Sequence, residues 1–596
     1  MSVTQRIRLV GHAMRADPLL CFVAHPGASS GNNVCPHTYT AHPSNNVTSC
    51  ALLCLADAEC DAFAMGDAGD PASTDCRTSH SCARAISHLD AYDGYQRKPG
   101  GDCGGWPKGI IFHSSSGLFA DGMILQRGSN TAVWGEGAKP RSTVTVSVGT
   151  TTADVVGAIA TTTADVVGGW RVVLPTVEAA ESTTLSVTDG ESNATLRDVA
   201  FGDVLLCGGQ SNMGFGMCGA QSANQTPAQA LQSLAPLRMF FQAGSGPYGG
   251  AGTRGCPVSV RGQVKRSMTE AQHWFKANAT NSGGFSAVCM LTAQRLYDSL
   301  RSQGVPAVPV GAVESCISGT PVGAWTPSNR SATSGGGVLW EQHMVGLLPM
   351  TFKAAIWDQG EADAKRTSSS YYASEFPLMI SLWRRYFTAA SPSTSFPFVY
   401  VELCVEYGAE PPKEADFWLA QRAAVADDPL VGFAVTTDIQ RALHPPDKQD
   451  VSERLTLELR RLAYGHAVVS RGPELRSQVV LADGKLALRF SNSSLTVHAG
   501  ILVGNPSFCA ANAGNNSMAV ARGPMRSLHY WIHNDTVLVE CPPGVAAIHI
   551  NADSATCFLY GPHGLPAPPI IANCTGNLIT PPKRNVSPFR SSKTWR

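Results

Sequence analysis

A serine stands directly after a glycine pair and a short apolar run, in the order Gly208-Gly209-Gln210-Ser211. Residues 204–206 favour a buried β-strand, and the two glycines permit a tight turn that exposes the residue after it. A serine hydroxyl there can attack a carbonyl carbon if a base, a group that orients the base and oxyanion donors lie nearby. Met213 stands where the nucleophile elbow G-x-S-x-G has its last glycine. A structural turn with an incidental serine is the alternative.

The chain after Ser211 alternates between strand and helix patterns. Residues 286–302 carry apolar side chains at near-helical spacing, and Gly304 and Pro306 then favour a stop. An amphipathic stretch and a second helical segment are indicated at residues 338–350 and 451–464, and strands at residues 308–313, 352–357 and 430–436. The alternation predicts an α/β domain with a mainly parallel sheet.

Each predicted strand is followed by a polar motif. Ser318-Gly319-Thr320 follows the first, Gln359-Gly360-Glu361 the second, and Asp438 and His444 the third. Because the carboxyl ends of parallel strands line one crevice, we expect these motifs to meet at Ser211.

The same motifs carry a family resemblance. The stretches around Ser211, Gly319 and Gln359, together with His444-Pro445-x2-Lys448, resemble the sialate O-acetylesterases of the SGNH-hydrolase superfamily, over about residues 117–572. The resemblance implies a flavodoxin-like catalytic domain with flanking β-sandwich domains. It also implies that the enzyme needs no metal or cofactor and removes O-acetyl groups from sialic acids.

The resemblance assigns a role to each motif. Ser211 would attack the acetyl carbonyl, and His444 would take its proton and return it to the leaving sugar hydroxyl. The oxyanion would accept hydrogen bonds from the N–H groups of Ser211 and Gly319 and from the side-chain amide of Gln359.

The acid that orients the histidine stays open. Many enzymes of this superfamily place an aspartate three residues before the histidine, but Arg441 occupies that position. Asp438 is the first candidate, Glu361 is the second, and a backbone carbonyl is the third.

The substrate is open as well. Asp358 and Asp363 replace a tyrosine and an asparagine of the family, and both add negative charge near a site meant for an anionic sugar. Arg441 is a candidate partner for the sialate carboxylate. An acetylesterase acting on another polysaccharide such as xylan, and a catalytically silent glycan-binding protein, are the alternatives.

Cysteines and sequons indicate the compartment. The 18 cysteines fall into an N-terminal, a central and a C-terminal group, each of even number, and sequons are spread along the chain. Both patterns suit an oxidising environment, so we expect a secreted or lysosomal protein. Several central cysteines are expected as disulfides or buried thiols rather than nucleophiles, namely Cys207, Cys218, Cys289 and Cys316.

Length and charge bound the rest. With 596 residues the chain exceeds a single core, and 45 basic residues balance 45 acidic ones, which speaks against a nucleic-acid partner. No apolar stretch reaches the length of a membrane span. The spacing of Cys50, Cys54 and Cys60 resembles the PAN/apple family, whose modules bind protein or carbohydrate, and a generic cysteine-rich spacer is the alternative.

The predicted domains follow from these patterns. The N-terminal part comprises a leader that need not be a complete signal region (residues 1–34), a cysteine-rich PAN/apple-like module (35–100) and a β-sandwich (106–200). The SGNH-type α/β esterase domain (201–470), a C-terminal β-rich domain (471–580) and a tail (581–596) follow.

Overall fold

The computed structural model forms two compact units, Met1–Met123 with Arg127–Ala200, and Ile124–Gln126 with Phe201–Arg596. The residues that it describes are 22–25, 39–43, 60–66, 75–80, 92–97, 109–113, 117–150, 156–165, 168–221, 226–232, 234–242, 273–303, 308–327, 337–390, 395–403, 411–423, 425–426, 428–439, 443–491, 494–499, 519–521, 530–541, 547–550 and 557–574. The predicted tail lies outside these ranges, and so does most of the predicted leader. The domain boundaries drawn from the sequence stay predictions.

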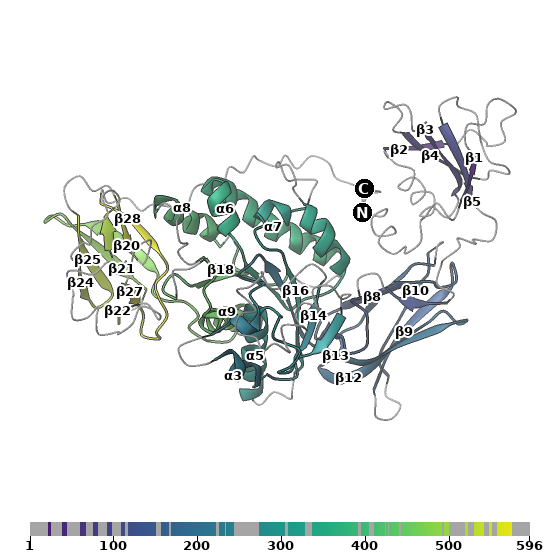
Figure 1. The fold of residues 1–596 in the computed structure, drawn as a ribbon, viewed down its shortest axis with the longest axis horizontal. Coiled ribbons are helices and arrows are strands. Elements are labelled where there is room, and N and C mark those ends of the chain that lie inside the picture. Colours follow the sequence, from purple (N-terminus) through teal and green to yellow (C-terminus); the bar gives the residue numbers. More distant parts are fainter. Residues whose placement is uncertain are drawn as a thin grey trace. The chain divides into compact units, whose positions relative to one another are not determined.

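The second unit is built on a mainly parallel sheet, as predicted (Figure 1). Seven of its strands stand in the order β15-β14-β16-β13-β17-β18-β19; within this order β14 and β15 pair antiparallel and the other neighbours pair parallel. Apart from β14 and β15, the order across the sheet is β16-β13-β17-β18-β19. Numbered by their sequence order, these five strands stand as 2-1-3-4-5, which is the flavodoxin-like order. The strands are β13 (Asn193–Gly209), β14 (Arg238–Phe241), β15 (His273–Lys276), β16 (Val310–Cys316), β17 (Ala354–Asp358), β18 (Phe398–Glu402) and β19 (Val431–Val435).

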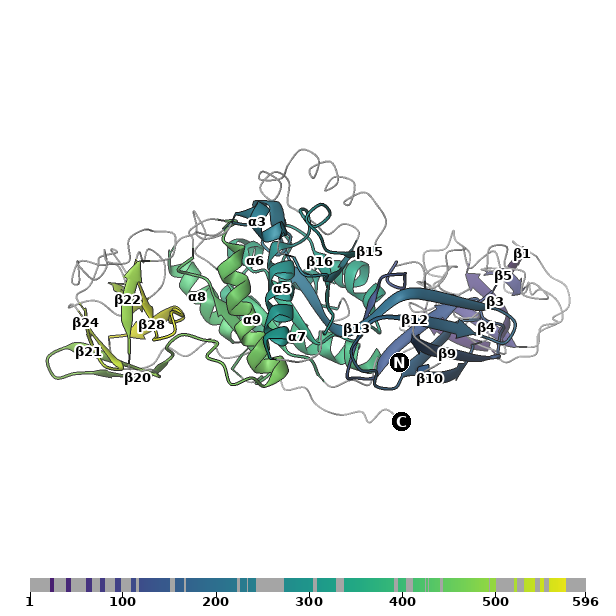
Figure 2. The same cartoon turned by 90° about the horizontal axis from the view of Figure 1, so that it is seen from below.

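Helices cover both faces of this sheet. In Figures 1 and 2, α5 (Ala287–Ser302) and α9 (Lys448–Tyr464) lie side by side, whereas α7 (Ser369–Ala390) and α8 (Pro411–Arg422) pack on each other on the opposite face. The predicted strands appear as β16, β17 and β19, and the predicted helices as α5 and α9. Residues 338–350 instead form a π-helical turn, Trp340–Met344, and a 3-10 turn, Val345–Leu347. Pro349, which has no N–H to donate, follows these short turns.

Local signals explain where the two central helices begin. The Ser286 hydroxyl accepts from Cys289 N (3.1 Å) at the start of α5, and the Asp447 carboxylate accepts from Asp450 N (3.1 Å) at the start of α9. A disulfide between Cys207 and Cys289 ties β13 to α5. Cys218 is also disulfide-bonded and the Cys316 thiol is buried, so these four cysteines are disulfides or buried thiols, as expected.

The first unit consists of antiparallel sheets. One contains β9 (Thr143–Thr150), β10 (Val156–Thr163) and β12 (Ala180–Thr188), and another contains β6 (Ile111–Phe112), β8 (Thr131–Glu136) and β11 (Trp170–Leu174). Alternate side chains of β9 and β12 are buried, which is the period-two pattern of a sheet with one covered face.

The N-terminal residues form a five-stranded antiparallel sheet in the order β1-β5-β3-β4-β2. Its strands are β1 (Phe22–His25), β2 (Tyr39–Pro43), β3 (Cys60–Gly66), β4 (Asp75–His80) and β5 (Tyr92–Arg97). The PAN/apple-like character of this module stays a prediction.

The C-terminal part is β-rich. A four-stranded sheet, β20-β21-β25-β24, shares one apolar core with the sheet β23-β26-β28 and the pair β22-β27. The strands are β20 (Leu475–Val480), β21 (Lys485–Phe490), β22 (Thr496–Ala499), β23 (Ala519–Ala521), β24 (Tyr530–His533), β25 (Thr536–Glu540), β26 (Ala547–Ile550), β27 (Cys557–Tyr560) and β28 (Ile570–Asn573). A disulfide joins Cys541 to Cys574.

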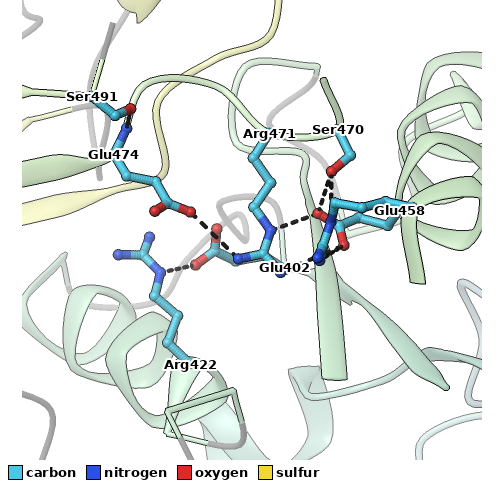
Figure 3. Close-up of polar contacts among 8 residues, drawn as sticks. Glu402, Arg422, Glu458, Ser470, Arg471, Glu474 and Ser491 are labelled. Atoms are coloured by element: carbon cyan, nitrogen blue, oxygen red, sulfur yellow. Dashed lines mark hydrogen bonds and ion pairs between the residues drawn. The ribbon is translucent and has the colours of Figure 1, made fainter. Parts of the chain in front are cut away.

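A network of charged side chains joins this C-terminal part to the α/β sheet (Figure 3). Glu458 of α9 accepts from Ser470 (3.0 Å) and from the guanidinium of Arg471, and Arg471 also stacks 4.5 Å over the Phe433 ring of the edge strand β19. Glu474, at the entrance to β20, pairs with Arg471 at 3.4 Å. The segment between α9 and β20 therefore lies along the edge of the sheet.

Candidate active site

The nucleophile turn begins where β13 ends. Gly209 has φ +145°, and a Cβ there would lie 2.2 Å from the carbonyl oxygen of Asp358. The N–H of Gln210 donates to this same oxygen at 3.0 Å. Only a glycine allows the chain to turn this close to β17, and the turn carries Ser211, which is 5% exposed.

The side chains on either side of Ser211 are anchored on one carboxylate. Gln210 Nε2 and Asn212 Nδ2 both donate to Glu361, the first residue of α6 (Glu361–Arg366). Glu361 is buried, and burial, followed by the charge of Asp358, raises its pKa to about 7. Glu361 therefore supports the residues that flank the serine.

The loop of His444 lies against the same turn. Asn212 Nδ2 donates to the carbonyl oxygen of Leu443 at 2.9 Å, and Gln221 N donates to that of Pro446 at 2.9 Å. Among the described residues the Ser211 hydroxyl has no hydrogen-bond partner. The structure thus brings the base loop to the nucleophile turn without closing a Ser211–His444 hydrogen bond, which in enzymes without substrate is often long.

The protonation state of His444 suits a base. Its side chain is half-buried, and burial, followed by the charges of Lys448 and Lys365, lowers its pKa. The imidazole is therefore neutral at pH 7 and able to accept a proton.

The loop after β16 carries Gly319. Ile317 N donates to Gly209 O at 3.1 Å, which ties this loop to the end of β13. Arg366 Nη1 donates to Gly319 O at 3.3 Å, and Asp363 accepts from Val322 N at 2.8 Å. Gly319 has φ +70°, and apart from its two chain neighbours no described residue has an atom within 4 Å of the place where a Cβ would stand.

Gln359 lies beside this loop with its amide engaged. Its Nε2 donates to Thr320 O at 3.0 Å and to Asp363, and its Oε1 accepts from Tyr372 at 3.2 Å. Donation to an oxyanion would require one of the two Nε2 bonds to open.

The first candidate for the triad acid is engaged elsewhere. Both carboxylate oxygens of the buried Asp438 accept from Arg454, at 2.6 and 2.8 Å, and one of them also accepts from Tyr560 at 2.8 Å. Glu361, the second candidate, accepts from Gln210 and Asn212. The identity of the acid stays a prediction.

Two residues of the site received no role from the sequence. Asn212 and Lys448 stand inside the motifs that carry the resemblance, and in the structure Lys448 Nζ donates to Asn212 Oδ1 at 2.7 Å. The available signal was position, because Asn212 directly follows the serine and Lys448 stands four residues after His444.

Two general properties of the described ranges complete the picture. They contain no group of three or more His, Cys, Asp or Glu side chains that could hold a metal ion. They also contain no helix that is both long and apolar enough to cross a membrane.

The fold defines an α/β protein in which the loops that carry Ser211, Gly319, Gln359 and His444 follow parallel strands of one sheet. The chain is 28% identical over 405 residues to the human sialate O-acetylesterase, covering 60% of this chain and 72% of that protein. It is 28% identical over 451 residues to the rat sialate O-acetylesterase, covering 61% and 76%. No family model matches the chain.

A solved structure agrees with these relatives. The carbohydrate acetylesterase from Xanthomonas citri is 27% identical, with a TM-score of 0.61, and the match covers 78% of this chain and 99% of that one. The chain is accordingly a carboxylic ester hydrolase with an SGNH-like fold.

Proposed function

We propose that this chain is a carbohydrate esterase that removes O-acetyl groups from sialic acids through an acetyl-enzyme. Ser211 Oγ attacks the acetyl carbonyl carbon while His444 takes the hydroxyl proton. The tetrahedral intermediate then collapses, the ester C–O bond breaks, and the sugar oxygen leaves with the proton from His444. In the second half, His444 takes a proton from water and the resulting hydroxide attacks the acetyl carbonyl carbon. The second tetrahedral intermediate collapses, the bond between the acetyl carbon and Ser211 Oγ breaks, His444 returns its proton to Oγ, and the acetyl group leaves as acetic acid, which ionises to acetate.

The oxyanion would be held by the N–H groups of Ser211 and Gly319. Each donor of this kind contributes on the order of 3 kcal/mol in a site from which water is excluded. The open space at Gly319 suits the approach of a ligand to the backbone. Gln359 is a further predicted donor, and it also holds Thr320, the next residue of the loop, at 3.0 Å.

One observation carries the proposal. The loops that follow β13, β16, β17 and β19 are joined by hydrogen bonds at the carboxyl edge of the sheet, from Ile317 to Gly209, from Gln210 to Asp358, and from Asn212 to Leu443. This edge, on either side of the first strand, is the place where open α/β sheets bind their ligands.

The charges near the site favour an anionic sugar over a neutral polysaccharide. Asp358, Glu361 and Asp363 are buried, whereas the exposed side chains of α6 are cationic. Lys365 acts electrostatically on His444, and Arg366 lies 3.3 Å from Gly319 O. A sialate carboxylate would meet these cations. Arg441, the partner suggested by the sequence, lies outside the described residues.

The decisive experiment compares two substrates with one preparation of enzyme. Acetate release from O-acetylated sialic acid and from acetylated xylan is measured for the unsubstituted protein, Ser211→Ala and Ser315→Ala. Ser315 is a buried serine of β16 whose hydroxyl has no hydrogen-bond partner among the described residues, so it is the matched control. We expect Ser211→Ala to lose turnover and Ser315→Ala to keep it, with sialate preferred over xylan.

Other results would support the alternatives. Preference for xylan would favour the polysaccharide acetylesterase. Turnover that is equal in Ser211→Ala and the unsubstituted protein would remove Ser211 as nucleophile. Glycan binding without turnover would favour the silent binding protein.

The compartment of the protein and the ligand of its N-terminal module are proposals as well. The disulfides Cys207–Cys289 and Cys541–Cys574 fit a secreted or lysosomal protein. The cysteine-rich module would bind a glycan or a protein.

A further inference from the structure

One side chain joins three elements of the candidate site. The amide of Asn212 donates through Nδ2 to Glu361 of α6 and to Leu443 O of the base loop (2.9 Å), and accepts through Oδ1 from Lys448 Nζ of α9 (2.7 Å). Asn212 is 3% exposed, and Glu361 and Lys448 are also buried. All three of these hydrogen bonds of the amide are made with residues from distant parts of the chain.

The partners determine which way the amide points. An ammonium group can only donate, so Lys448 requires the oxygen of Asn212 on its side. A carbonyl and an ionised carboxylate can only accept, so Leu443 O and Glu361 require the nitrogen on theirs. Reversal of the amide would oppose like groups at all three contacts. Lys448 and Glu361 therefore present the Asn212 N–H groups to the base loop in one orientation.

The hydrogen bond from Asn212 to Leu443 O links the neighbours of Ser211 and His444. Asn212 is covalently next to Ser211, and Leu443 is covalently next to His444. The hydrogen bond between Asn212 and Leu443 O is thus a bridge one residue away from both reacting side chains. A bridge of this kind limits how far the imidazole can move from the hydroxyl, and a misplacement of about 1 Å can cost about 100-fold in rate.

We propose that Asn212 is a positioning residue that holds the His444 loop on the Ser211 turn, with Glu361 and Lys448 fixing the orientation of its amide. The inference rests on the proposed function, since it assigns Ser211 and His444 as nucleophile and base. It explains how Glu361 contributes to the site, because this carboxylate acts on His444 through Asn212.

An exchange of groups separates this role from plain stabilisation. In Asn212→Asp the side chain can no longer donate, and two carboxylates face each other. In the double variant Asn212→Asp/Glu361→Gln, the new amide donates to the new carboxylate and still accepts from Gln210, and Lys448 keeps its acceptor. The double variant has the same charge and the same atoms as the unsubstituted protein, but Leu443 O has no donor from residue 212.

The two variants are compared by thermal unfolding, by kcat and KM for an acetyl ester, and by the rate at which a fluorophosphonate probe labels Ser211. We expect Asn212→Asp to lower both the Tm and kcat. In the double variant the Tm should recover most of the loss, whereas kcat and the labelling rate stay about 100-fold below those of the unsubstituted protein, with KM changed less than about threefold.

The pH profile supplies an independent readout. A base loop released from Asn212 exposes His444, so the pKa of the imidazole should rise toward its ordinary value and the acid limb of kcat/KM should move to higher pH. Recovery of kcat together with Tm in the double variant, or an unmoved acid limb with a lowered kcat, would overturn the proposal. If Asn212→Asp does not fold, the double variant decides alone. A folded double variant with full kcat would overturn the proposal, and one with kcat about 100-fold lower would support it.

These results are distinguishable from failure of the proposed function. An active Ser211→Ala protein would overturn the nucleophile assignment and the inference together. An inactive Ser211→Ala protein with a fully active double variant would overturn the inference alone.

Discussion

At the scale of single residues, buried charge sets the protonation states of the site. Burial and two lysines lower the pKa of His444, whereas burial and Asp358 raise that of Glu361 to about 7. His444 is therefore neutral at neutral pH, and the Glu361 carboxylate is close to taking up a proton. Ionised, Glu361 is an acceptor for both Gln210 and Asn212.

Replacing Lys365 with methionine should move the acid limb of activity. The charge of Lys365 lowers the pKa of His444, so Lys365→Met should raise that pKa and shift the acid limb of kcat/KM to higher pH. Because Lys365 is exposed, the difference should largely vanish at about 1 M salt, where the Debye length is about 3 Å.

The matched control is Lys485→Met. Lys485 is paired with Asp483 in the C-terminal sheet, so its loss should not affect the limb. A limb that is the same at low salt in Lys365→Met and in the unsubstituted protein would contradict the assignment of the charge effect.

At the scale of elements, each active-site loop is held by the element next to it. The Gly319 loop is hydrogen-bonded to Asp363 and Arg366 of α6, and the turn of Ser211 is hydrogen-bonded to Asp358 of β17. Glu314 makes a similar joint deeper in the unit, where its carboxylate on β16 accepts from Ser286 N (2.9 Å) at the start of α5. Burial raises the pKa of Glu314 to about 7.

Glu314→Gln should make the protein more stable above neutral pH. Between the unfolded pKa near 4.5 and the folded pKa near 7, the folded state holds a proton that the unfolded state has lost, so stability contributed by this group falls as pH rises through that window. Glutamine keeps an acceptor for Ser286 and carries no charge to desolvate. The variant should therefore match the unsubstituted protein in Tm at pH 5 and exceed it at pH 8.

Differential scanning calorimetry from pH 5 to pH 8 measures the difference in Tm between the variant and the unsubstituted protein. The other buried carboxylates are common to both proteins, so their effects on Tm cancel in this difference. Each kcal/mol corresponds to roughly 2–4 °C in a domain of this size class. A constant Tm difference from pH 5 to pH 8 would show that Glu314 does not titrate in this window.

At the scale of the whole second unit, a buried hydrogen bond and a network of ion pairs connect the α/β sheet to the C-terminal β-rich part. Asp438, which follows β19, pairs with Arg454 of α9 and with Tyr560 of β27. The network of Glu458, Arg471 and Glu474 makes a second connection along the edge of the sheet (Figure 3). The C-terminal part thus contacts Asp438, six residues before His444 in the sequence.

Substitutions at this joint should affect stability more than chemistry. Tyr560→Phe removes one hydrogen bond and should lower the free energy of unfolding by about 1 kcal/mol. Asp438→Asn breaks a buried ion pair and should cost about 3–5 kcal/mol. In both, kcat of the folded enzyme should stay within about threefold, since the Asp438 carboxylate faces Arg454 and Tyr560.

Urea unfolding measures the free energy of unfolding of each variant, and kcat is measured at a temperature where the variant is folded. A folded Asp438→Asn enzyme that has lost more than about 100-fold in kcat would instead assign Asp438 as the triad acid.

Much of this protein could be predicted from its sequence because the relevant signals are local. The strand-and-helix alternation predicted the parallel sheet, and the polar motifs after the strands predicted which loops meet at Ser211. The contacts of the site could not be predicted, because they join residues far apart in the chain. Asn212 meets Glu361, Leu443 and Lys448 across 149, 231 and 236 residues. No local pattern shows that Asp438 would pair with Arg454 and Tyr560, or that Asn212 would bridge the nucleophile and the base, since only the folded chain decides which donor reaches which acceptor.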